Sequence, residues 1–366
     1  MTPTLSDVMP SAAAALGVPG FTDSLGLGPS RHVVVVLIDG LGALQLRDHR
    51  DRAPALSAMT SLVGMDTGLQ ASFPTTTPVG LASLGTGLSP GSHGFVGASF
   101  LLPETGHILA PLHWGSTPTP VAVQPEATVF ERVTRAGSAA VTIAPAAYQD
   151  SGLTRAVLRG AEYLSAEDSG QRALALREQL QSDTPTLAYV YWAELDRTGH
   201  EFGIASSQWE SALAQADAMV AALVETLPSS TTLVVTADHG MVDCPDDRRV
   251  NLDVAPGLND GVIHVAGEPR MRHLYTRAGA AADVAATWRH ELAGRCDVHT
   301  RQELMDSGLL GAVDPDLAGR VGDVVAVARD DWMLTSHVDT RVSSLRGQHG
   351  AGTPQERMVP ALVHRR

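Results

Sequence analysis

The chain contains no lysine, so all 26 of its basic residues are arginines. This absence excludes enzymes that depend on a Schiff-base lysine, a pyridoxal-phosphate lysine or a P-loop lysine. Cysteine is almost as scarce, because only Cys244 and Cys296 occur, far apart and without the C-x-x-C spacing of a thiolate metal site. We therefore expect two reduced, structural cysteines and neither a disulfide framework nor a thiolate cluster.

Long apolar runs and a basic N-terminal segment are also missing. No apolar stretch approaches the ~20 residues of a membrane-spanning helix, and Gly17 interrupts the apolar run near the N-terminus. The formal net charge of -14 argues against a nucleic-acid duplex as partner, because such binders display a basic face. We expect a cytoplasmic protein that acts on a small molecule, with no membrane partner; its oligomeric state stays open.

Apolar, β-branched runs alternate with helical patterns in a chain of 366 residues that is 44% hydrophobic. This alternation is typical of buried parallel strands in an α/β protein. The predicted strands are "HVVVVLI" (32–38), "AAVTIA" (139–144), "TLAYVYW" (186–192) and "TTLVVTA" (231–237), and the clearest predicted helices lie in 126–137 and 208–227.

After residue 255 the sequence pattern changes to shorter predicted strands and one helix-like stretch, which predicts a small α+β insertion or cap. We therefore divide the chain into a catalytic core, residues 1–255 plus 341–366, and an insertion, residues 256–340. The stretches 103–125 and 243–261 are the most loop-like. The first of these loops and the insertion are candidate walls of a substrate pocket.

The segment "SFPTTTPVGLASLGTGLSPGSHG" places three consecutive threonines between two prolines. Thr is a good N-cap and Pro is favoured at the first helical position, so the pattern predicts a helix that starts at Pro78, capped by Thr77. Gly85 or Gly87 would end this helix. The N-terminus of a helix also binds anions, so the capping hydroxyl would sit where a phosphate binds.

Aspartate follows three of the predicted strands closely, as Asp39, Asp196 and Asp238. The carboxyl ends of parallel strands meet at one edge of a sheet, where open α/β sheets bind their ligands. Histidines accompany the aspartates: His200 comes four residues after Asp196, and His239 directly follows Asp238. A further candidate, His349, stands in the Gly-rich "RGQHGAG".

Six Asp and His side chains are enough for two metal sites, each with a position open to substrate. Two metals about 4 Å apart can clamp the attacking and leaving oxygens of an in-line phosphoryl displacement. Coordination to such a cation would turn the hydroxyl of Thr77 into a nucleophile near neutral pH. Histidine ligands favour Zn²⁺ over Mg²⁺, although manganese or iron also suits this ligand set.

The ordered set of motifs resembles the alkaline phosphatase superfamily, and within it the type I phosphodiesterase and nucleotide pyrophosphatase family. The motifs run through most of the chain, from "VVVVLIDGLG" through the threonine segment, "AELDRTGHEFG" and "TADHGMVD" to "GQHG". The resemblance implies an α/β/α sandwich with a mostly parallel central sheet. It also implies hydrolysis of phosphodiester or pyrophosphate bonds in nucleotide-type substrates through a phospho-threonine intermediate.

Residue by residue, the resemblance implies two zinc sites. One would be formed by Asp39, Thr77, Asp238 and His239, and the other by Asp196, His200 and His349. The nucleophile is the last threonine of the family's P-[ST]-x-T segment, which is Thr77 when Pro74 is matched; Thr76 is the alternative. The family's pattern has an asparagine three residues after the nucleophile, where this chain has Gly80, so the substrate subclass stays open.

A phosphomonoester dianion needs an additional cation, usually an arginine, and the nucleophile segment has none. This absence favours a diester or pyrophosphate substrate. The candidate arginines for contacts with the site are Arg197, Arg270, Arg272 and Arg346, and the candidate aromatic residues for stacking a base are Trp114, Tyr148 and Trp332. The alternatives are a phosphomonoesterase or phosphonate hydrolase with the same site, and a non-catalytic metal-binding scaffold.

Overall fold

A seven-stranded sheet organises the computed structural model of the protein, which describes residues 3–64, 68–255 and 257–366. Strands β9, β1, β8, β6 and β7 run parallel to one another, whereas β19 and β2 complete one edge in antiparallel pairing. In spatial order the strands are β2 (Thr60–Ser61), β19 (Leu362–Arg365), β9 (Thr231–Thr236), β1 (His32–Ile38), β8 (Thr186–Trp192), β6 (Ala139–Ala144) and β7 (Glu162–Ser165).

Strand β1 lies at the centre of the sheet, and all of its residues are buried. A strand with covered faces on both sides can be apolar at every position, which is why its "HVVVVLI" does not alternate. Its neighbours are in register with it, since Leu37 lies beside Thr236 of β9 and Ile38 beside Trp192 of β8. The three strands therefore end together, and the residues that follow them emerge at one edge.

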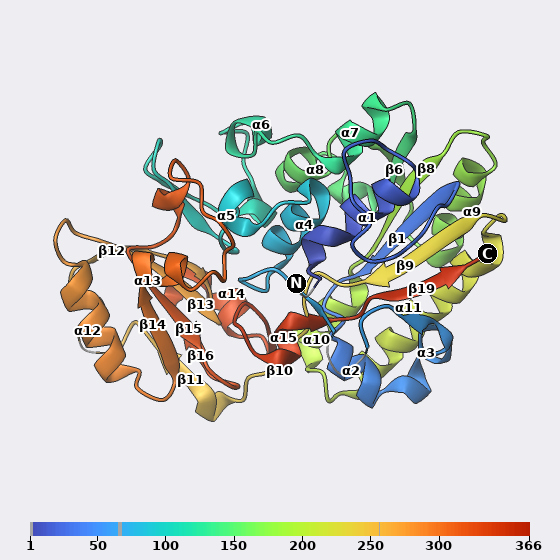
Figure 1. The fold of residues 1–366 in the computed structure, drawn as a ribbon. Coiled ribbons are helices and arrows are strands. Elements are labelled where there is room, and N and C mark those ends of the chain that lie inside the picture. The colour runs from blue at the N-terminus through green and yellow to red at the C-terminus, as the bar shows by residue number, and fades with distance from the viewer. Residues whose placement is uncertain (1–2, 65–67, 256) are drawn as a thin grey trace.

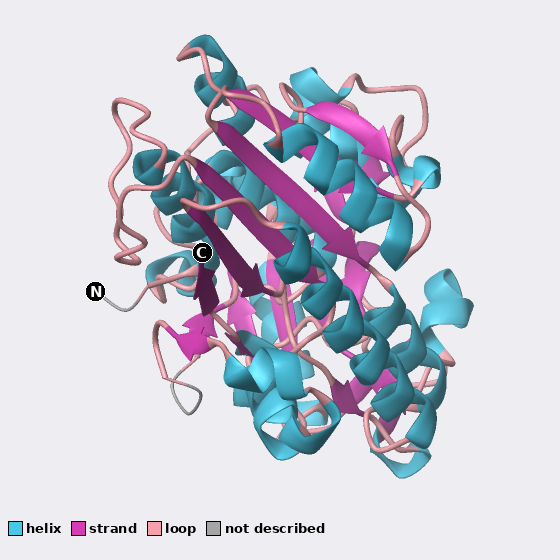
Figure 2. Ribbon diagram, turned by 90° about the vertical axis from the view of Figure 1, so that its right-hand side faces the viewer, coloured by secondary structure: helices cyan, strands magenta, loops and turns pink. Residues whose placement is uncertain are grey.

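Helices cover both faces of this sheet (Figures 1 and 2). On one side α11 packs against α3, α9 and α10, and on the other α4 packs against α1, α7 and α8. The bounds are α1 (Val8–Ala15), α2 (Ala43–Asp48), α3 (Pro54–Ala58), α4 (Thr77–Thr86), α5 (Pro90–His93), α6 (Pro120–Val123), α7 (Val129–Arg135), α8 (Gly152–Val157), α9 (Ser169–Leu180), α10 (Glu194–Phe202), α11 (Ser207–Thr226), α12 (Ala281–Glu291), α13 (Arg301–Asp306), α14 (Thr340–Ser343) and α15 (Pro354–Arg357). The chain is thus an α/β protein with a mostly parallel sheet, as its sequence predicts.

A smaller antiparallel sheet lies beside the main one (Figure 1) and has its own hydrophobic cluster around Trp288. Its order is β12 (Val262–Glu268), β13 (Met271–Thr276), β15 (Val324–Ala328) and β14 (Cys296–Thr300). All four strands fall within the insertion that the sequence predicts, although position 256 at its boundary lies outside the described residues. The buried ion pair of Arg270 with Glu356, 2.8 Å between Nη2 and Oε2, links the turn before β13 to α15.

Four two-stranded pairs complete the strands. They are β10 (Val242–Asp243) with β17 (Gly347–Gln348), β11 (Arg249–Asn251) with β16 (Met333–Thr335), β18 (Met358–Val359) with β3 (Leu69–Gln70), and β4 (Phe100–Leu102) with β5 (His107–Leu109). The β10–β17 pair matters most for function because it brings residues 347–349 next to the segment that follows β9. Among the described residues, none of the helices has the length and apolarity needed to cross a membrane.

Helix α4 begins one residue earlier than the sequence predicts. Thr76 is the N-cap, with extended backbone, and Thr77 is the first helical residue, so the prediction that Thr77 caps the helix is wrong. The reason is that Pro78 tolerates either of the first helical positions, because neither needs its missing N–H. The helix ends at Thr86, followed by Gly87 in the left-handed conformation with φ 71°.

A buried histidine, His93, contacts α4 through the side chain of Ser83. His93 accepts a hydrogen bond from the backbone N–H of Phe95 at Nδ1, 3.1 Å, and its Nε2 lies 2.9 Å from Ser83 Oγ on α4. Burial lowers the pKa of His93 to about 3, because a charged imidazolium there would lose its water and repel Arg320. His93 is therefore uncharged in the folded protein at neutral pH.

This histidine predicts how stability depends on pH. Because the unfolded chain takes up a proton near pH 6.5 and folded His93 does so only near pH 3, its contribution is complete above pH 6.5 and is lost as the pH falls. In His93→Gln we expect the free energy of unfolding to fall less steeply between pH 6 and pH 4, by about 1.4 kcal/mol per pH unit. Urea unfolding of both proteins at several pH values measures this, and equal slopes would contradict it.

Candidate metal centre

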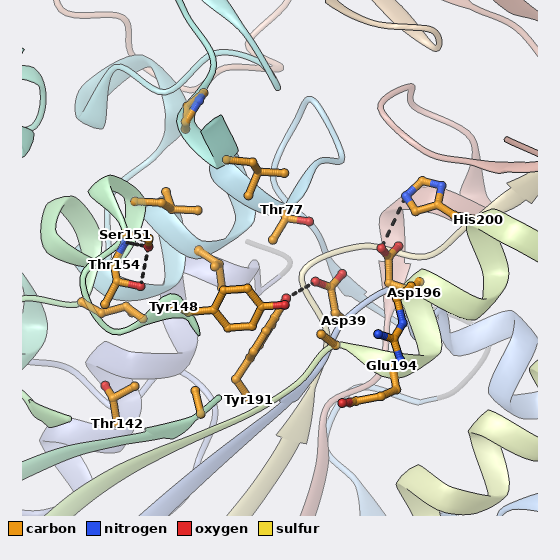
Figure 3. Close-up of a pocket in the computed structure, with 18 of the residues that line it drawn as sticks. Asp39, Thr77, Thr142, Tyr148, Ser151, Thr154, Tyr191, Glu194, Asp196 and His200 are labelled. Atoms are coloured by element: carbon orange, nitrogen blue, oxygen red, sulfur yellow. Dashed lines mark hydrogen bonds and ion pairs between the residues drawn. The ribbon is translucent and has the colours of Figure 1, made fainter. Parts of the chain in front are cut away.

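The predicted site residues come together at the edge of the main sheet where β1, β8 and β9 end. Asp39 follows β1, and Asp238 and His239 follow β9. Asp196 and His200 lie one turn apart on α10, so their side chains share one face of that helix. Thr77 opens α4, and His349 follows β17. Five separate segments therefore bring all seven residues to one place, and Figure 3 shows four of them around a pocket.

His239 is the centre of one group of contacts. Its Nε2 lies 3.3 Å from Thr77 Oγ1, 3.5 Å from Asp238 Oδ2 and 3.6 Å from Asp39 Oδ1. His239 and Asp238 are fully buried, and Asp39 and Thr77 are nearly so. Ligand atoms of Asp39, Asp238 and His239 thus lie close enough together to hold one metal ion, and Thr77 joins this group through its contact with His239.

The second group adjoins the first. His200 Nε2 lies 3.4 Å from Asp196 Oδ2 and 3.1 Å from His349 Nε2, and His349 Nε2 lies 3.9 Å from Asp196 Oδ1. The ring of His349 also stacks on that of His239, with centroids 3.8 Å apart. His239 is close enough to share a ligand set with Asp196 and His349 as well, so the two groups form one continuous cluster.

All three histidines are held in the same tautomer. The ring nitrogen Nδ1 lies 2.7 Å from the carbonyl oxygen of Gly347 in His200, 3.0 Å from that of Gly240 in His239, and 2.9 Å from that of Thr75 in His349. A carbonyl only accepts, so each Nδ1 carries the proton and each Nε2 presents a lone pair to the cluster. Backbone carbonyls orient metal-ligating histidines in this way.

The carboxylates carry unbalanced negative charge. Burial raises the pKa of Asp39 well above its usual range, and the charges of Asp238 and Asp196 raise it further. Burial also raises the pKa of Asp238. Within the described part of the chain, Asp39 Oδ1, Asp196 Oδ1 and Asp238 Oδ2 are buried oxygens without a hydrogen-bond donor. Such groups are costly unless something positive lies between them.

Divalent metal ions fit this donor set. Carboxylate oxygens that accept no hydrogen bond face unprotonated histidine Nε2 atoms. Both kinds of atom are ligands that zinc accepts. The 3.1 Å between His200 Nε2 and His349 Nε2 is close to the ~3.3 Å that separates two nitrogens on one tetrahedral zinc. Two nitrogen lone pairs at this distance repel each other unless a cation joins them, so the cluster is suited to bind metal.

The three consecutive threonines have different surroundings. Thr75 donates to the carbonyl of Ala351, 2.7 Å, and accepts from the N–H of Gly350, 3.0 Å, which anchors the turn that carries His349. Thr76 hydrogen-bonds to Glu268. Only Thr77 reaches the acid and histidine cluster and lines the pocket (Figure 3).

Gly80 has a packing role. A Cβ atom built there would lie 2.6 Å from Cβ of Asp238, far inside van der Waals contact. Helix α4 therefore rests directly on the segment that carries Asp238, and an asparagine at this position would push the two apart. The missing side chain lets Thr77 approach His239.

Two residues of the site have no counterpart in the sequence prediction. Tyr191 donates a short hydrogen bond to Asp39 Oδ2, and Glu268 Oε2 lies 3.4 Å from His349 Nδ1. Burial raises the pKa of both side chains well above the usual range. Tyr191 alternates with Tyr189 on β8, which is a weak signal that both face one side. Glu268 gives no signal, because its strand belongs to the insertion.

A cavity of about 740 Å³ opens beside Thr77 and Asp39. Its lining includes the apolar and aromatic side chains of Leu81, Leu112, Tyr148, Leu153, Leu158 and Tyr191. The hydroxyl groups of Ser151 and Thr154 lie beside Tyr148 in the same wall (Figure 3). Pro111 and Leu112 come from the loop 103–125 that the sequence names as a wall. The insertion does not contribute, because none of the described residues in 257–340 lines this cavity, so that part of the prediction is wrong.

Some of the candidate arginines and aromatic residues line the cavity, and the others do not. Arg270 pairs with Glu356, Arg272 with Asp339 and Arg346 with Asp243, whereas Arg197 lines the cavity. Of the aromatics, Tyr148 lines the cavity, while Trp114 packs over Gly152 and Trp332 joins the cluster of the small sheet. The sequence missed Arg341, which also lines the cavity.

The family model for type I phosphodiesterase / nucleotide pyrophosphatase matches residues 33–352. Bis(5'-adenosyl)-triphosphatase ENPP4 of Bos taurus is 35% identical over 193 residues, which cover 50% of this chain and 40% of that protein. Ectonucleotide pyrophosphatase/phosphodiesterase family member 5 of Homo sapiens is 30% identical over 98 residues, 25% of this chain and 20% of that protein. The matched segments thus span less than half of these curated relatives.

Solved structures show the same fold. Murine ENPP5, as an inactive threonine-to-alanine variant in complex with AMP, superimposes with a TM-score of 0.72 at 20% identity, covering 91% of this chain and 87% of that one. Human ENPP5 gives a TM-score of 0.70 at 18% identity, with 91% and 87% covered.

Proposed function

The chain belongs to the type I phosphodiesterase / nucleotide pyrophosphatase family, and from this premise we propose that it hydrolyses phosphodiester or pyrophosphate bonds of nucleotides through a phospho-threonine intermediate on Thr77. The observation that carries the proposal is the position of Thr77 Oγ1. It lies 3.3 Å from His239 Nε2, beside buried carboxylates and at the wall of a cavity large enough for a nucleotide.

The metal cluster is part of this proposal. We assign Asp39, Thr77, Asp238 and His239 to one divalent ion and Asp196, His200 and His349 to the other, with zinc as the metal. When bound, the ions supply positive charge that lowers the pKa of the threonine hydroxyl and stabilises the leaving oxygen. Three backbone carbonyls keep the histidine Nε2 atoms directed at the cluster, which prepares the site for this charge.

Thr77 is well placed for nucleophilic attack. It opens α4, and its own N–H has no partner in the described part of the chain, so the helix terminus offers a donor and a positive dipole to the phosphoryl oxygens. Thr77 Oγ1 attacks phosphorus, the bond from phosphorus to the leaving oxygen breaks, and the leaving group departs from the opposite side. Water then hydrolyses the phospho-threonine and regenerates the hydroxyl.

The cavity favours a nucleotide as the substrate. Tyr148 is 41% exposed and packs edge-on against Tyr191, with ring centroids 5.8 Å apart, so its free face is available to a planar base. Leu112 and Leu153 line the same cavity. The bovine relative is named for a dinucleoside triphosphate and the murine structure holds AMP, which supports a nucleotide here too.

The test compares zinc-replete protein on the p-nitrophenyl ester of a nucleoside 5′-monophosphate and on p-nitrophenyl phosphate. We expect kcat/KM for the diester to exceed that for the monoester by at least about tenfold, because no arginine joins the described contacts of Thr77 to hold a third phosphoryl charge. A chelator should abolish the activity and zinc should restore it. The reverse ratio would indicate a monoesterase, and inactivity on both substrates would contradict the proposal.

A further inference from the structure

The small sheet meets the site at a metal ligand and not at the substrate cavity. A two-residue turn joins β12 to β13, so that Glu268 ends one strand and Met271 begins the other. None of the described residues in 257–340 lines the cavity beside Thr77. The side chain of Glu268 instead contacts the ring of His349. The small sheet therefore has a contact with the metal cluster that the substrate pocket does not explain.

Glu268 contacts both groups of the metal cluster through residues that lie behind the ligand atoms. Its Oε2 lies 3.4 Å from Nδ1 of His349, which belongs to one group. Its carboxyl group also accepts a hydrogen bond from Thr76, the N-cap of α4, and the next residue is Thr77 of the other group. Glu268 is 7% exposed. One buried carboxyl group thus connects the ring of a metal ligand with the start of the helix that carries the nucleophile.

The backbone beside His349 is shaped to receive this carboxyl group. Gly350 has a φ of 123°, which side-chain-bearing residues rarely adopt. A Cβ atom built on Gly350 would lie 2.6 Å from Cδ and 2.9 Å from Oε1 of Glu268, inside van der Waals contact. The carboxyl group therefore rests directly on the backbone of the turn, and a larger residue at position 350 would push it away from His349.

The small sheet is attached to this segment without Glu268. Arg270 of the same turn is fully buried and pairs with Glu356, whose Oε1 accepts the N–H of Ala351 at 2.9 Å. Among the ion pairs of the described residues, Glu268 has no arginine partner. A buried carboxyl group without a cation lowers the stability of a fold. A purely structural role therefore does not account for Glu268.

Glu268 is the second acceptor near Nδ1 of His349. The carbonyl oxygen of Thr75 lies 2.9 Å from this nitrogen and fixes the tautomer. A carboxyl oxygen near the same N–H has a further effect, because its negative charge attracts the proton and strengthens the lone pair on Nε2. The two acceptors therefore affect the same ring in different ways.

We propose that Glu268 is a positioning residue that fixes the ring of His349 relative to the N-terminus of α4, so that the small sheet takes part in metal binding. This role rests on the metal sites of the proposed function and assigns a task to the insertion. Partners behind a metal-ligating histidine set its orientation and basicity, and their loss costs about 10- to 100-fold in metal affinity or activity. Glu268 acts through His349 and Thr76, because it does not line the cavity.

Zinc titration of the metal-free protein, in competition with a chelator, tests this role without turnover. The binding step to follow is the one that His349→Ala abolishes. In Glu268→Ala we expect the affinity of this step to fall about 10- to 100-fold. Glu268→Gln keeps the size of the side chain but has one oxygen for two donors, so it should lose less, about three- to tenfold.

Asp323→Ala is the matched control within the insertion. Asp323 accepts the N–H of Thr276 at 2.8 Å and pairs with Arg301, and Thr276 lies at the opposite end of β13 from the turn. This variant should unfold at a lower temperature and keep the zinc affinity of the wild type to within about twofold. The visible spectrum of cobalt-loaded protein, which depends on ligand geometry, should change in Glu268→Ala and not in Asp323→Ala.

The outcomes distinguish this role from the proposed function. If the wild type binds zinc and Glu268→Ala binds it equally well, or if Asp323→Ala loses as much affinity, the role of Glu268 is refuted while the metal site stands. If Glu268→Ala does not fold, wild-type affinity in Glu268→Gln refutes the role. If the wild type itself binds no zinc, the metal assignment of the proposed function is refuted, and the role of Glu268 with it.

Discussion

Replacing Thr77 with alanine should lower turnover of nucleotide diesters at least about 10⁴-fold while the protein retains its bound metal. The hydroxyl is the only group of Thr77 that reaches His239, and its loss removes the atom that we expect to attack phosphorus. Metal content should survive because Asp39, Asp238 and His239 remain in place. Steady-state kinetics and metal analysis of the same preparation measure both quantities.

Thr76 provides the matched control, because it is the alternative nucleophile. Its side chain hydrogen-bonds to Glu268, which contacts Nδ1 of His349 and not the Nε2 atom that faces the cluster, so Thr76→Ala should cost less than about 100-fold. Thr77→Ser keeps a hydroxyl and should retain measurable activity. Full activity in Thr77→Ala, or complete loss in Thr76→Ala with Thr77 intact, would move the nucleophile to the neighbouring residue.

Much of the sheet is predictable because its strands are buried on both faces. β1, β6 and β8 have the predicted bounds, and β9 ends one residue earlier than predicted. Continuous apolar, β-branched runs leave no other stable arrangement for these segments. Since parallel strands end at one edge, the aspartates that follow them were expected to converge, and the structure places Asp39, Asp196 and Asp238 together there.

The remainder of the site depends on contacts between distant segments. Glu268 reaches His349 from the small sheet, and Arg341 comes to the cavity on a helix of only four residues, so no local pattern marks either of them. The cap of α4 was misplaced by one residue because Thr76 and Thr77 are equally good caps, and Pro78 is tolerated at either of the first two helical positions.

The fully buried Asp238 leads to a prediction in which activity and stability change in opposite directions. In Asp238→Asn we expect activity to fall more than about 10³-fold, because the ligand that holds metal beside Thr77 is lost. The metal-free protein should nevertheless unfold at a higher temperature than metal-free wild type at pH 8. The amide removes a buried negative charge that lies close to Asp39 and Asp196, and it still accepts the N–H of Gly40.

The pKa shift gives the sign of the pH dependence. Burial raises the pKa of Asp238 above its unfolded value, so the folded metal-free protein binds more protons than the unfolded chain just above pH 3.8. Its stability therefore decreases as the pH rises above 3.8, and the advantage of Asp238→Asn should grow with pH until the folded carboxyl group is ionised. Thermal unfolding with chelator present measures this difference, and added zinc should reverse the order of the two proteins.

Asp217 is the control for a buried aspartate without metal. Its oxygens accept the N–H groups of Leu56 at 2.7 Å and Ala55 at 3.2 Å, so Asp217→Asn loses an acceptor and should destabilise the protein by about 1–3 kcal/mol without loss of activity at 25 °C. If Asp→Asn stabilises the metal-free protein at position 238 and destabilises it at position 217, the carboxylate of Asp238 lowers the stability of the metal-free fold and serves to bind the metal. A metal-free Asp238→Asn protein less stable than wild type would mean that its carboxylate is a structural group like that of Asp217.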